Sequence, residues 1–346
     1  MFLHTNKEIT FKSHVQKWAT VFAVVFTGVV VVPVVGFVVY GKYIVQYEAR
    51  NIGDVVATIP QFPVGVDPVN GLIAEDSVAD DFFEEHYATR RENSGLSGAW
   101  FDKALGKLAL MDWYQNLASA SSRILVIQPG ERKEQIAHNF GKILKWTEAE
   151  REQFQALVVE TEPVIQEGKF YPGKFTVAKS ASPVDVAPLV VEGFNDAILE
   201  HYGPGVDAQV PLEQAIIIAS LLEREAYDFT DARHISGVIW NRLFTDMRLQ
   251  LDATLQYARG DKPWEPWWPT PRPQDKYIDS PYNTYKYEGL PPTAISNPSA
   301  EAVLAALNPV KTSCMFYFHD DNAGFHCSDT YEEHVEKLKS VYGRGR

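Results

Sequence analysis

Two glutamates, Glu223 and Glu225, close an otherwise apolar stretch of the chain and are its best candidates for moving a proton. The stretch reads PLEQAIIIASLLERE and begins at Pro211, a residue suited to the first position of a helix because its φ is fixed and its missing N–H costs nothing there. We predict a helix from about residue 211 to 226. Since this helix is apolar nearly all round, it should be buried, and burial raises the pKa of a carboxyl group. A general acid needs such a pKa.

Helical spacing favours Glu223 over Glu225. At about 100° per residue, Glu223 shares a face with Ala219 and Ser220, whereas Glu225 lies among larger apolar side chains. The small neighbours should leave room for a substrate beside the Glu223 carboxyl group. The alternative is that both glutamates lie at an exposed helix end and pair with Arg224 or Arg233. The helix alone leaves these two interpretations open.

The composition indicates a globular protein and argues against a nucleic-acid-binding protein. The chain has 346 residues with 45% hydrophobic content, enough for one or two globular domains and an anchor. Its formal net charge is -13. Nucleic-acid binders concentrate Lys and Arg to displace counterions from phosphates, so we expect no nucleic-acid partner.

The two cysteines, Cys314 and Cys327, flank a turn that we predict near Asn322. Two cysteines do not make a disulfide framework, and around such a turn they would not lie directly opposite each other. We therefore expect two free thiols, with a bridge in an oxidising compartment as the alternative.

Residues 18–40 form a stretch without charge that is long enough to cross the roughly 30 Å hydrocarbon core of a membrane as a helix. No cleavage site follows it, which disfavours a signal peptide. Lysines before the span outnumber the basic residues just after it, which predicts a cytoplasmic tail at 1–17 and the remainder outside. We expect a single-pass protein of the bacterial inner (cytoplasmic) membrane with a periplasmic catalytic domain.

The remainder is expected to have an α+β fold. Residues 41–120 form a juxtamembrane region to which we assign no function. From residue 121 to 165 the pattern is a strand, a Pro-Gly turn and a helix, followed by a second helix opened by a capping box of Thr147 and Glu150. Residues 166–346 carry the chemistry, and another helix is expected from Pro188 to Tyr202.

Several ordered motifs then point to one family. They are ASLLERE from Ala219, MRLQLDATLQY from Met247, SPYNTY from Ser280, GLPP from Gly289, ISNP from Ile295 and FYFHDDNAGFHCSDTYEEH from Phe316. In order and spacing, over roughly residues 165 to 335, the chain resembles the endolytic murein transglycosylases, the MltG/YceG-like family. The resemblance implies a LysM-like module at 121–165 and a YceG-like catalytic domain at 166–346.

The resemblance also implies a mechanism. Glu223 would protonate the glycosidic oxygen between MurNAc and GlcNAc within a peptidoglycan strand. It would then accept a proton from the MurNAc 6-hydroxyl group, which attacks its own anomeric carbon and leaves a 1,6-anhydro end. No metal or cofactor is implied. The expected partners are peptidoglycan strands, the membrane and peptidoglycan synthases, with cleavage of nascent strands terminating their elongation.

Five further residues are candidates for orienting the sugar: Gln250, Asp252, Tyr282, Asn283 and Thr284. For Asp252, an electrostatic role and a turn-capping role remain equally open. Three positions depart from the family pattern, with Ala253 and Ala294 in place of prolines and Ser299 in place of a glycine. We expect Trp264, Trp267 and Trp268 to pack in a long loop rather than to stack on glycan.

Two alternatives to a lytic transglycosylase remain. One is a muramidase, with Asp252 as the second carboxylate that a hydrolytic glycosidase requires. The other is a non-catalytic wall-binding scaffold, suggested by the module at 121–165.

Overall fold

The predicted helix that carries Glu223 is α11, Leu212–Glu225, and its core-facing and opposite faces are both buried, as expected from its apolar sequence. Pro211 is its N-cap rather than its first helical residue. The computed structural model of the chain describes residues 60–74, 78–85, 121–161, 164–260 and 264–343. All of these belong to one unit, Thr58–Gln115 together with Ser121–Arg346.

The predicted anchor at 18–40 and the tail at 1–17 lie outside the described residues, and of the juxtamembrane region at 41–120 only 60–74 and 78–85 are described. Within the described ranges, none of the helices combines the length and the apolar character that a membrane crossing requires.

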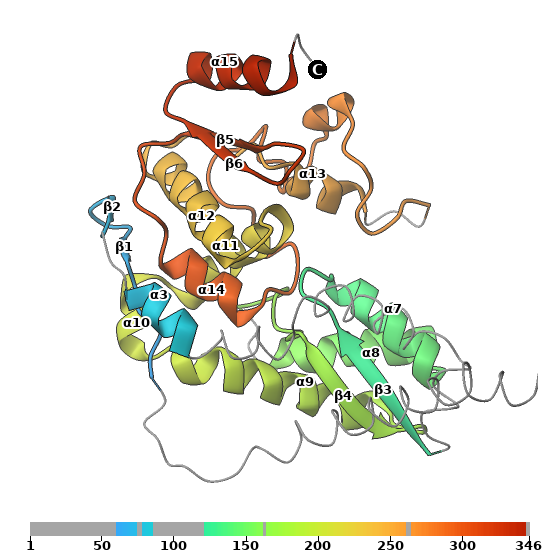
Figure 1. The fold of residues 1–346 in the computed structure, drawn as a ribbon. Helices are drawn as coiled ribbons and strands as arrows, with labels where there is room; N and C mark the ends of the chain where they lie inside the picture. Colours follow the sequence, from blue (N-terminus) through green and yellow to red (C-terminus); the bar gives the residue numbers. More distant parts are fainter. Residues whose placement is uncertain (1–59, 75–77, 86–120, 162–163, 261–263, 344–346) are drawn as a thin grey trace, which may run out of the picture. The chain divides into compact units, whose positions relative to one another are not determined.

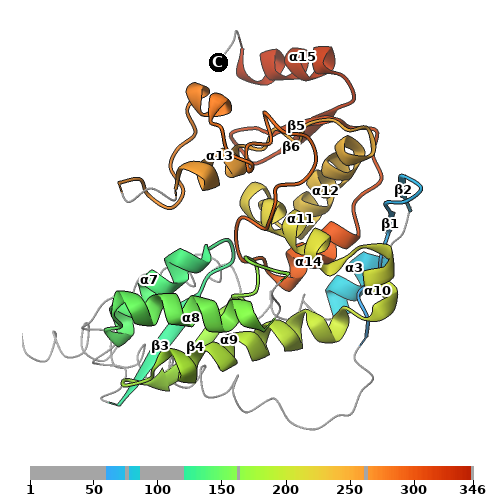
Figure 2. The same cartoon turned by 180° about the vertical axis from the view of Figure 1, so that it is seen from behind.

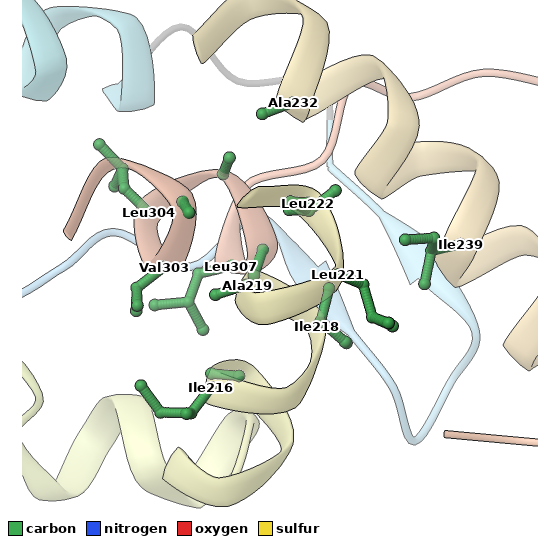
Figure 3. Packing of buried hydrophobic residues seen from close by; sticks show 14 of the residues in the cluster. Ile216, Ile218, Ala219, Leu221, Leu222, Ala232, Ile239, Val303, Leu304 and Leu307 are labelled. Carbon is green, nitrogen blue, oxygen red and sulfur yellow. The ribbon is translucent and has the colours of Figure 1, made fainter. Parts of the chain in front are cut away.

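Helix α11 packs between α12, Phe229–Phe244, and α14, Ala300–Leu307. In Figure 3, Ala219 of α11 lies beside Leu307 of α14, and all three helices contribute to the same hydrophobic cluster. Residue Leu307 and its neighbours in this cluster are almost completely inaccessible to water. This packing fixes the last turn of α11, and with it Glu223, against the first turn of α14.

A second hydrophobic cluster holds a small αβ module together (Figures 1 and 2). Strand β3, Ser122–Ile127, pairs antiparallel with β4, Gly173–Ala178. Helices α7, Lys133–Leu144, α8, Glu148–Glu160, and α9, Pro183–Ala197, complete it. The module predicted for 121–165 therefore shares its core with β4 and α9.

Local signals set the helix ends of this module. The capping box of Thr147 and Glu150 is confirmed, since the Thr147 hydroxyl accepts from the Glu150 backbone N–H and the Glu150 carboxylate accepts from the Thr147 N–H. The start predicted at Pro188 is wrong, because α9 begins at Pro183 and contains Pro188. The Asp185 carboxylate accepts hydrogen bonds from the backbone N–H and hydroxyl of Ser182, and these bonds open the helix earlier.

The chain closes with the hairpin of β5, Phe316–His319, and β6, Phe325–Ser328, followed by α15, Tyr331–Tyr342. The expectation of two free thiols is wrong: Cys314 and Cys327 form a disulfide with Cα atoms 5.7 Å apart. The hairpin register pairs Cys327 with Tyr317, so the cysteines are not opposite each other within the ladder. Cys314 instead precedes β5, where the Asn241 amide donates to the carbonyls of Thr312 and Cys314 and bends the chain.

The other elements are short. They are β1, Val66–Asp67; β2, Leu72–Ile73; α3, Val78–Phe83; η3, Leu199–His201; α10, Pro204–Gln209; α13, Asp252–Arg259; and η4, Pro273–Tyr277. Among the described residues the sheets are three antiparallel pairs, β1 with β2, β3 with β4, and β5 with β6. Helices segregated from such small antiparallel sheets make the fold α+β, as predicted.

Candidate active site

Glu223 is half-buried in the last turn of α11, and one of its oxygens is fixed. Its Oε2 accepts hydrogen bonds from the Ser299 backbone nitrogen at 3.0 Å and from the Ser299 hydroxyl at 2.8 Å. Its Oε1 has no hydrogen bond to any residue that the structure describes. Burial raises the pKa of the Glu223 carboxyl group, and the Ser299 hydrogen bonds and the Arg224 charge oppose that rise. Glu223 is thus suited to hold a proton on Oε1.

The prediction that Ala219 and Ser220 leave space for a substrate is wrong. Both are fully buried. The Ser220 hydroxyl accepts from the Ile295 N–H at 3.0 Å, and the Ser296 hydroxyl donates to the Ser220 carbonyl at 3.1 Å. The loop before α14 therefore fills this face of α11, because its backbone polar groups find partners there.

The turn after β3 approaches Glu223 instead. Gly130 has a φ of +80°, and a Cβ atom at this position would lie 3.7 Å from the Glu223 Cγ atom and 3.3 Å from the Arg224 Nη1 atom. The Gly130 N–H donates to the Asn297 carbonyl at 2.9 Å, and this hydrogen bond ties the turn to the loop before α14. The αβ module thus contributes backbone to the surroundings of Glu223.

Glu225 has a different environment. Its Oε2 accepts from the Tyr317 hydroxyl at 3.1 Å, and its Oε1 accepts from the Ala253 N–H at 3.4 Å. Burial raises the pKa of this carboxyl group too, with Tyr317 and Ala253 opposing the rise and the nearby Asp252 charge adding to it. With both oxygens engaged, Glu225 links α11 to β5 and α13.

The alternative in which the glutamates pair with neighbouring arginines is wrong for the described residues. Arg233 donates to the Asn308 carbonyl at 2.8 Å and pairs with Asp80. Arg224 lies with its guanidinium carbon 3.9 Å from the centroid of the Trp268 ring.

Gln250 and Asp252 are exposed on either side of the buried Leu251. Gln250 has a φ of 51°, an uncommon conformation for a residue other than glycine, and such conformations concentrate at functional sites. The Asp252 Oδ1 atom accepts a hydrogen bond from the Tyr285 hydroxyl at 2.7 Å. The structure therefore brings Asp252 close to Glu225, with its side chain open to solvent.

The three predicted residues of the SPYNTY motif lie in one loop but differ in exposure. Tyr282 is half-buried, and its hydroxyl is 2.8 Å from the Thr293 hydroxyl. Asn283 is fully buried, with its amide donating to the carbonyls of Lys276 and Ile278. The Thr284 hydroxyl accepts from the Leu251 N–H at 3.0 Å. Asn283 and Thr284 therefore hold the loop and the Gln250 segment in place, and contact with a ligand remains a prediction for all three.

Two neighbours of Glu223 were not predicted as site residues. Ser299 was noted as a departure from a family pattern, although a serine directly before the apolar segment AEAVLAAL is an N-cap signal. Arg224 was considered only as a partner of the glutamates. Within the described ranges, no group of three or more His, Cys, Asp or Glu side chains is arranged to hold a metal ion.

Comparison with known proteins gives one consistent result. The model of the YceG-like family matches residues 78–340. An endolytic murein transglycosylase of Bacillus subtilis (strain 168) is 31% identical over 177 residues, which are 51% of this chain and 48% of the relative. One of Streptococcus pneumoniae serotype 2 is 27% identical over 169 residues, 49% of this chain and 31% of the relative. The matches thus span less than half of each relative's length.

A solved structure is also similar. The crystal structure of a YceG-like protein from Listeria monocytogenes is 28% identical and superposes with a TM-score of 0.54, covering 62% of this chain and 75% of the other.

Proposed function

The chain belongs to the YceG-like family, and from this premise we propose that it is an endolytic murein transglycosylase in which Glu223 transfers the proton. The observation that carries the proposal is the environment of that carboxyl group. Its pKa is raised by burial, one oxygen is held by Ser299, and the other is left without a partner among the described residues. General acid catalysis near neutral pH requires this combination of a retained proton and a fixed orientation.

In the proposed reaction, Glu223 gives its proton to the glycosidic oxygen as the bond from the MurNAc anomeric carbon breaks. The MurNAc 6-hydroxyl oxygen then bonds to that carbon, and its proton passes to Glu223, which regains its starting state. No water is consumed. Because the attacking group belongs to the sugar itself, its high effective molarity replaces an activated water and a second carboxylate is not required.

The exposed side chains of Gln250 and Asp252, and the half-buried Tyr282, are proposed to contact the sugar. Asp252 is held by the Tyr285 hydroxyl, and its negative charge would stabilise positive charge that develops on the sugar ring. Asn283 and Thr284 would act through the loop that they support. No metal or cofactor takes part in this proposal.

The cellular setting is part of the same proposal. Residues 18–40 would anchor the chain in the bacterial inner membrane with residues 1–17 in the cytoplasm and the catalytic domain in the periplasm. There it would cut nascent strands at MurNAc–GlcNAc bonds and so end their elongation, beside peptidoglycan synthases. The LysM-like module would then support the cleavage site through Gly130.

Product analysis tests the reaction. The full chain, solubilised in mild detergent, should release fragments with 1,6-anhydroMurNAc ends from isolated peptidoglycan, and Glu223→Gln should release none while keeping the melting temperature of the parent. Glu213→Gln, in the first turn of the same helix, is the matched control and should retain activity. Undiminished cleavage by Glu223→Gln would reject the assignment, and no cleavage by the unmodified chain would favour a wall-binding scaffold.

The muramidase alternative is supported by the exposure of Asp252 and its fixed orientation. In that case, the products would end in reducing MurNAc without the anhydro bond, and Asp252→Asn would abolish cleavage as completely as Glu223→Gln. The transglycosylase proposal expects anhydro ends and a partial loss of rate in Asp252→Asn.

A further inference from the structure

Arg224 differs from the buried arginines of the described chain. Each of those donates a hydrogen bond to a carbonyl or carboxylate oxygen: Arg123 to Ser122, Arg132 to Tyr257, Arg233 to Asn308, Arg242 to Met315 and Arg259 to Asp275. Arg224 is half-buried, yet it makes no hydrogen bond or ion pair to any described residue, and its Nε atom is buried without a partner. In a chain with a net charge of -13, an unpaired guanidinium beside Glu223 is exceptional.

The two carboxylates nearest in sequence make no hydrogen bond to Arg224, and three of their four oxygens are held by other groups. Glu223 Oε2 faces Ser299, and the Glu225 oxygens face Tyr317 and Ala253. Burial lowers the pKa of the Arg224 guanidinium, and the charges of Glu225 and Glu223 counter that only through space. Withdrawing a charge from water without a hydrogen-bonding partner is costly, and a partner supplied by a ligand would remove that cost.

The guanidinium is also held in a fixed plane. One side lies over the Trp268 ring at 3.9 Å. Gly130 also lies close to it, since a Cβ atom there would be 3.3 Å from both Cδ and Nη1 of Arg224. A planar group restrained by an aromatic face and by a nearby glycine turn has already lost much of its freedom, so ligand binding has less entropy left to remove.

We infer that Arg224 binds the acyl oxygens of the lactyl group of muramic acid. This inference rests on the proposed function, because it takes the substrate to be a strand of alternating GlcNAc and MurNAc. The lactyl group is the substituent that distinguishes the second sugar from the first. Its acyl group is a carboxylate in strands without peptides and an amide in strands that carry them. A guanidinium fork matches a carboxylate with two parallel hydrogen bonds and an amide carbonyl with one.

The position of Arg224 in the sequence relates this contact to the choice of the bond that is cleaved. Arg224 follows Glu223 directly, so a sugar bound by its lactyl group would be the one whose anomeric bond receives the proton. Arg224 would thereby select the MurNAc–GlcNAc bond over the GlcNAc–MurNAc bond of the same strand. Trp268 would be a positioning residue that acts through Arg224.

The test compares three ligands of equal length in a background that cannot cleave. They are glycan strands without peptides, strands that carry stem peptides, and chitooligosaccharides, which lack the lactyl group. The full chain with Glu223→Gln is compared with Glu223→Gln/Arg224→Met, Glu223→Gln/Arg224→Lys and, as a control, Glu223→Gln/Lys179→Met. Lys179 is exposed and follows β4 at the end of the β3–β4 pair where β3 begins, away from the Gly130 turn that follows the other end of β3.

Arg224→Met should weaken binding of peptide-free strands about tenfold or more, peptide-bearing strands less, and chitooligosaccharides not at all. Arg224→Lys should recover part of the affinity for peptide-free strands, since it restores the charge without the planar fork. Equal weakening for all three ligands, no weakening, or a loss confined to peptide-bearing strands would overturn the inference. Melting temperatures within a few degrees of the parent would exclude unfolding as the cause.

The binding test of Arg224 can be judged independently of whether the proposed reaction takes place. Binding is measured with Glu223 already replaced, so it does not depend on proton transfer by that residue. If the unmodified chain cleaves no strand while Arg224→Met weakens the binding of lactyl-bearing strands and not of chitooligosaccharides, the reaction fails and the inference stands. If the chain cleaves but Arg224→Met weakens the binding of all three ligands equally, or of none, the inference alone fails.

Discussion

Ser299 donates two hydrogen bonds to the same oxygen of Glu223, from its backbone nitrogen and from its hydroxyl group. The same hydroxyl accepts a hydrogen bond from the Ala302 N–H at 3.2 Å and so caps α14. The proposed proton-transferring group and the start of a packed helix therefore meet at one side chain. Both hydrogen bonds from Ser299 lower the pKa of Glu223, against the larger effect of burial.

Replacing Ser299 by alanine should shift the pH dependence of cleavage. The change removes one of the hydrogen bonds that lower the pKa of Glu223, so this pKa should rise further. Because the acid form starts the reaction, activity falls as pH rises through that pKa, and the descending limb of kcat/KM should move to higher pH. Loss of the cap should also destabilise the protein by about 1 kcal/mol.

Two matched variants separate the hydroxyl from the backbone at this position. Ser299→Thr keeps a hydroxyl and should leave the descending limb in place. Ser299→Gly introduces the glycine of the family pattern. It keeps only the backbone N–H and should shift the limb as alanine does. A limb that stays fixed in Ser299→Ala would show that the hydroxyl does not act on the proton of Glu223.

Glu131 should make the protein less stable as pH rises. Burial raises its pKa from 4.5 to about 7, despite hydrogen bonds from Gln128, Gln135 and Asn139. A carboxyl group whose folded pKa is raised contributes stability below its unfolded pKa, and that contribution is lost as pH rises through the folded value. Glu131→Gln should thus be more stable than the parent at about pH 8, by about 1 to 3 kcal/mol, and similar to it at about pH 5. Chemical denaturation at each pH measures this difference in stability.

Glu150 provides a control whose stability contribution should change with pH in the opposite direction. It is an exposed member of a capping box, and hydrogen bonds from Thr147 lower its pKa. Its contribution is present above the unfolded pKa and is lost as pH falls, so Glu150→Gln should be less stable than the parent at about pH 8 and equal to it near pH 3. The Glu131 interpretation fails if Glu131→Gln follows the same pattern as Glu150→Gln.

The disulfide leads to a third prediction. The Cys314–Cys327 bridge closes a loop with a sequence separation of 13, and the hairpin inside it places Tyr317 against Glu225. The double variant Cys314→Ala/Cys327→Ala should lose about 2 to 3 kcal/mol of unfolding free energy, because the unfolded chain regains the freedom that the bridge removes. Titration of the unfolded, unreduced protein with a thiol reagent should find no free thiol. Two free thiols would contradict the bridge.

The sequence was informative where a pattern is local. The apolar residues around α11 are consecutive, so burial of the helix and a raised pKa for Glu223 could be predicted from the sequence. The capping box at Thr147 is equally local. The Cys314–Cys327 bridge was not predictable from hairpin register, because Cys314 lies outside the ladder and is placed by Asn241 of α12.

The detailed surroundings of Glu223 depend on contacts across the chain. Helical spacing alone placed small neighbours beside it, but the segment that fills this space comes from Ile295 to Ser299, far along the chain. The state of Arg224 depends in the same way on Trp268 and Gly130, which belong to separate segments. The hydrophobic periodicity of one helix does not predict contacts with distant segments. The partners of a site residue are therefore known only from the packed structure.

Variants of Asn297 should show whether Glu167 keeps its proton in the folded protein. Its Oδ1 accepts from the N–H groups of Gly168 and Phe170, and its Nδ2 donates to the Glu131 carbonyl and to Glu167 Oε1 at 2.7 Å. Burial raises the pKa of Glu167 to about 7, with the Lys133 charge opposing the rise. All four hydrogen-bonding positions of the amide are therefore used.

Asn297→Asp keeps the shape of the side chain but places a carboxylate where Glu167 needs a donor. At about pH 5, Glu167 holds its proton and can donate it to the introduced carboxylate, so the loss relative to the parent should come mainly from the missing hydrogen bond to the Glu131 carbonyl and be smaller than at about pH 8. At about pH 8, two carboxylates would face each other in a buried site, and the loss should reach about 3 kcal/mol or more. Asn297→Ala, which leaves the same partners unpaired at either pH, should lose a similar amount at both. Chemical denaturation of the three proteins at the two pH values measures these differences, and an equal loss for Asn297→Asp at both would show that Glu167 does not retain its proton there.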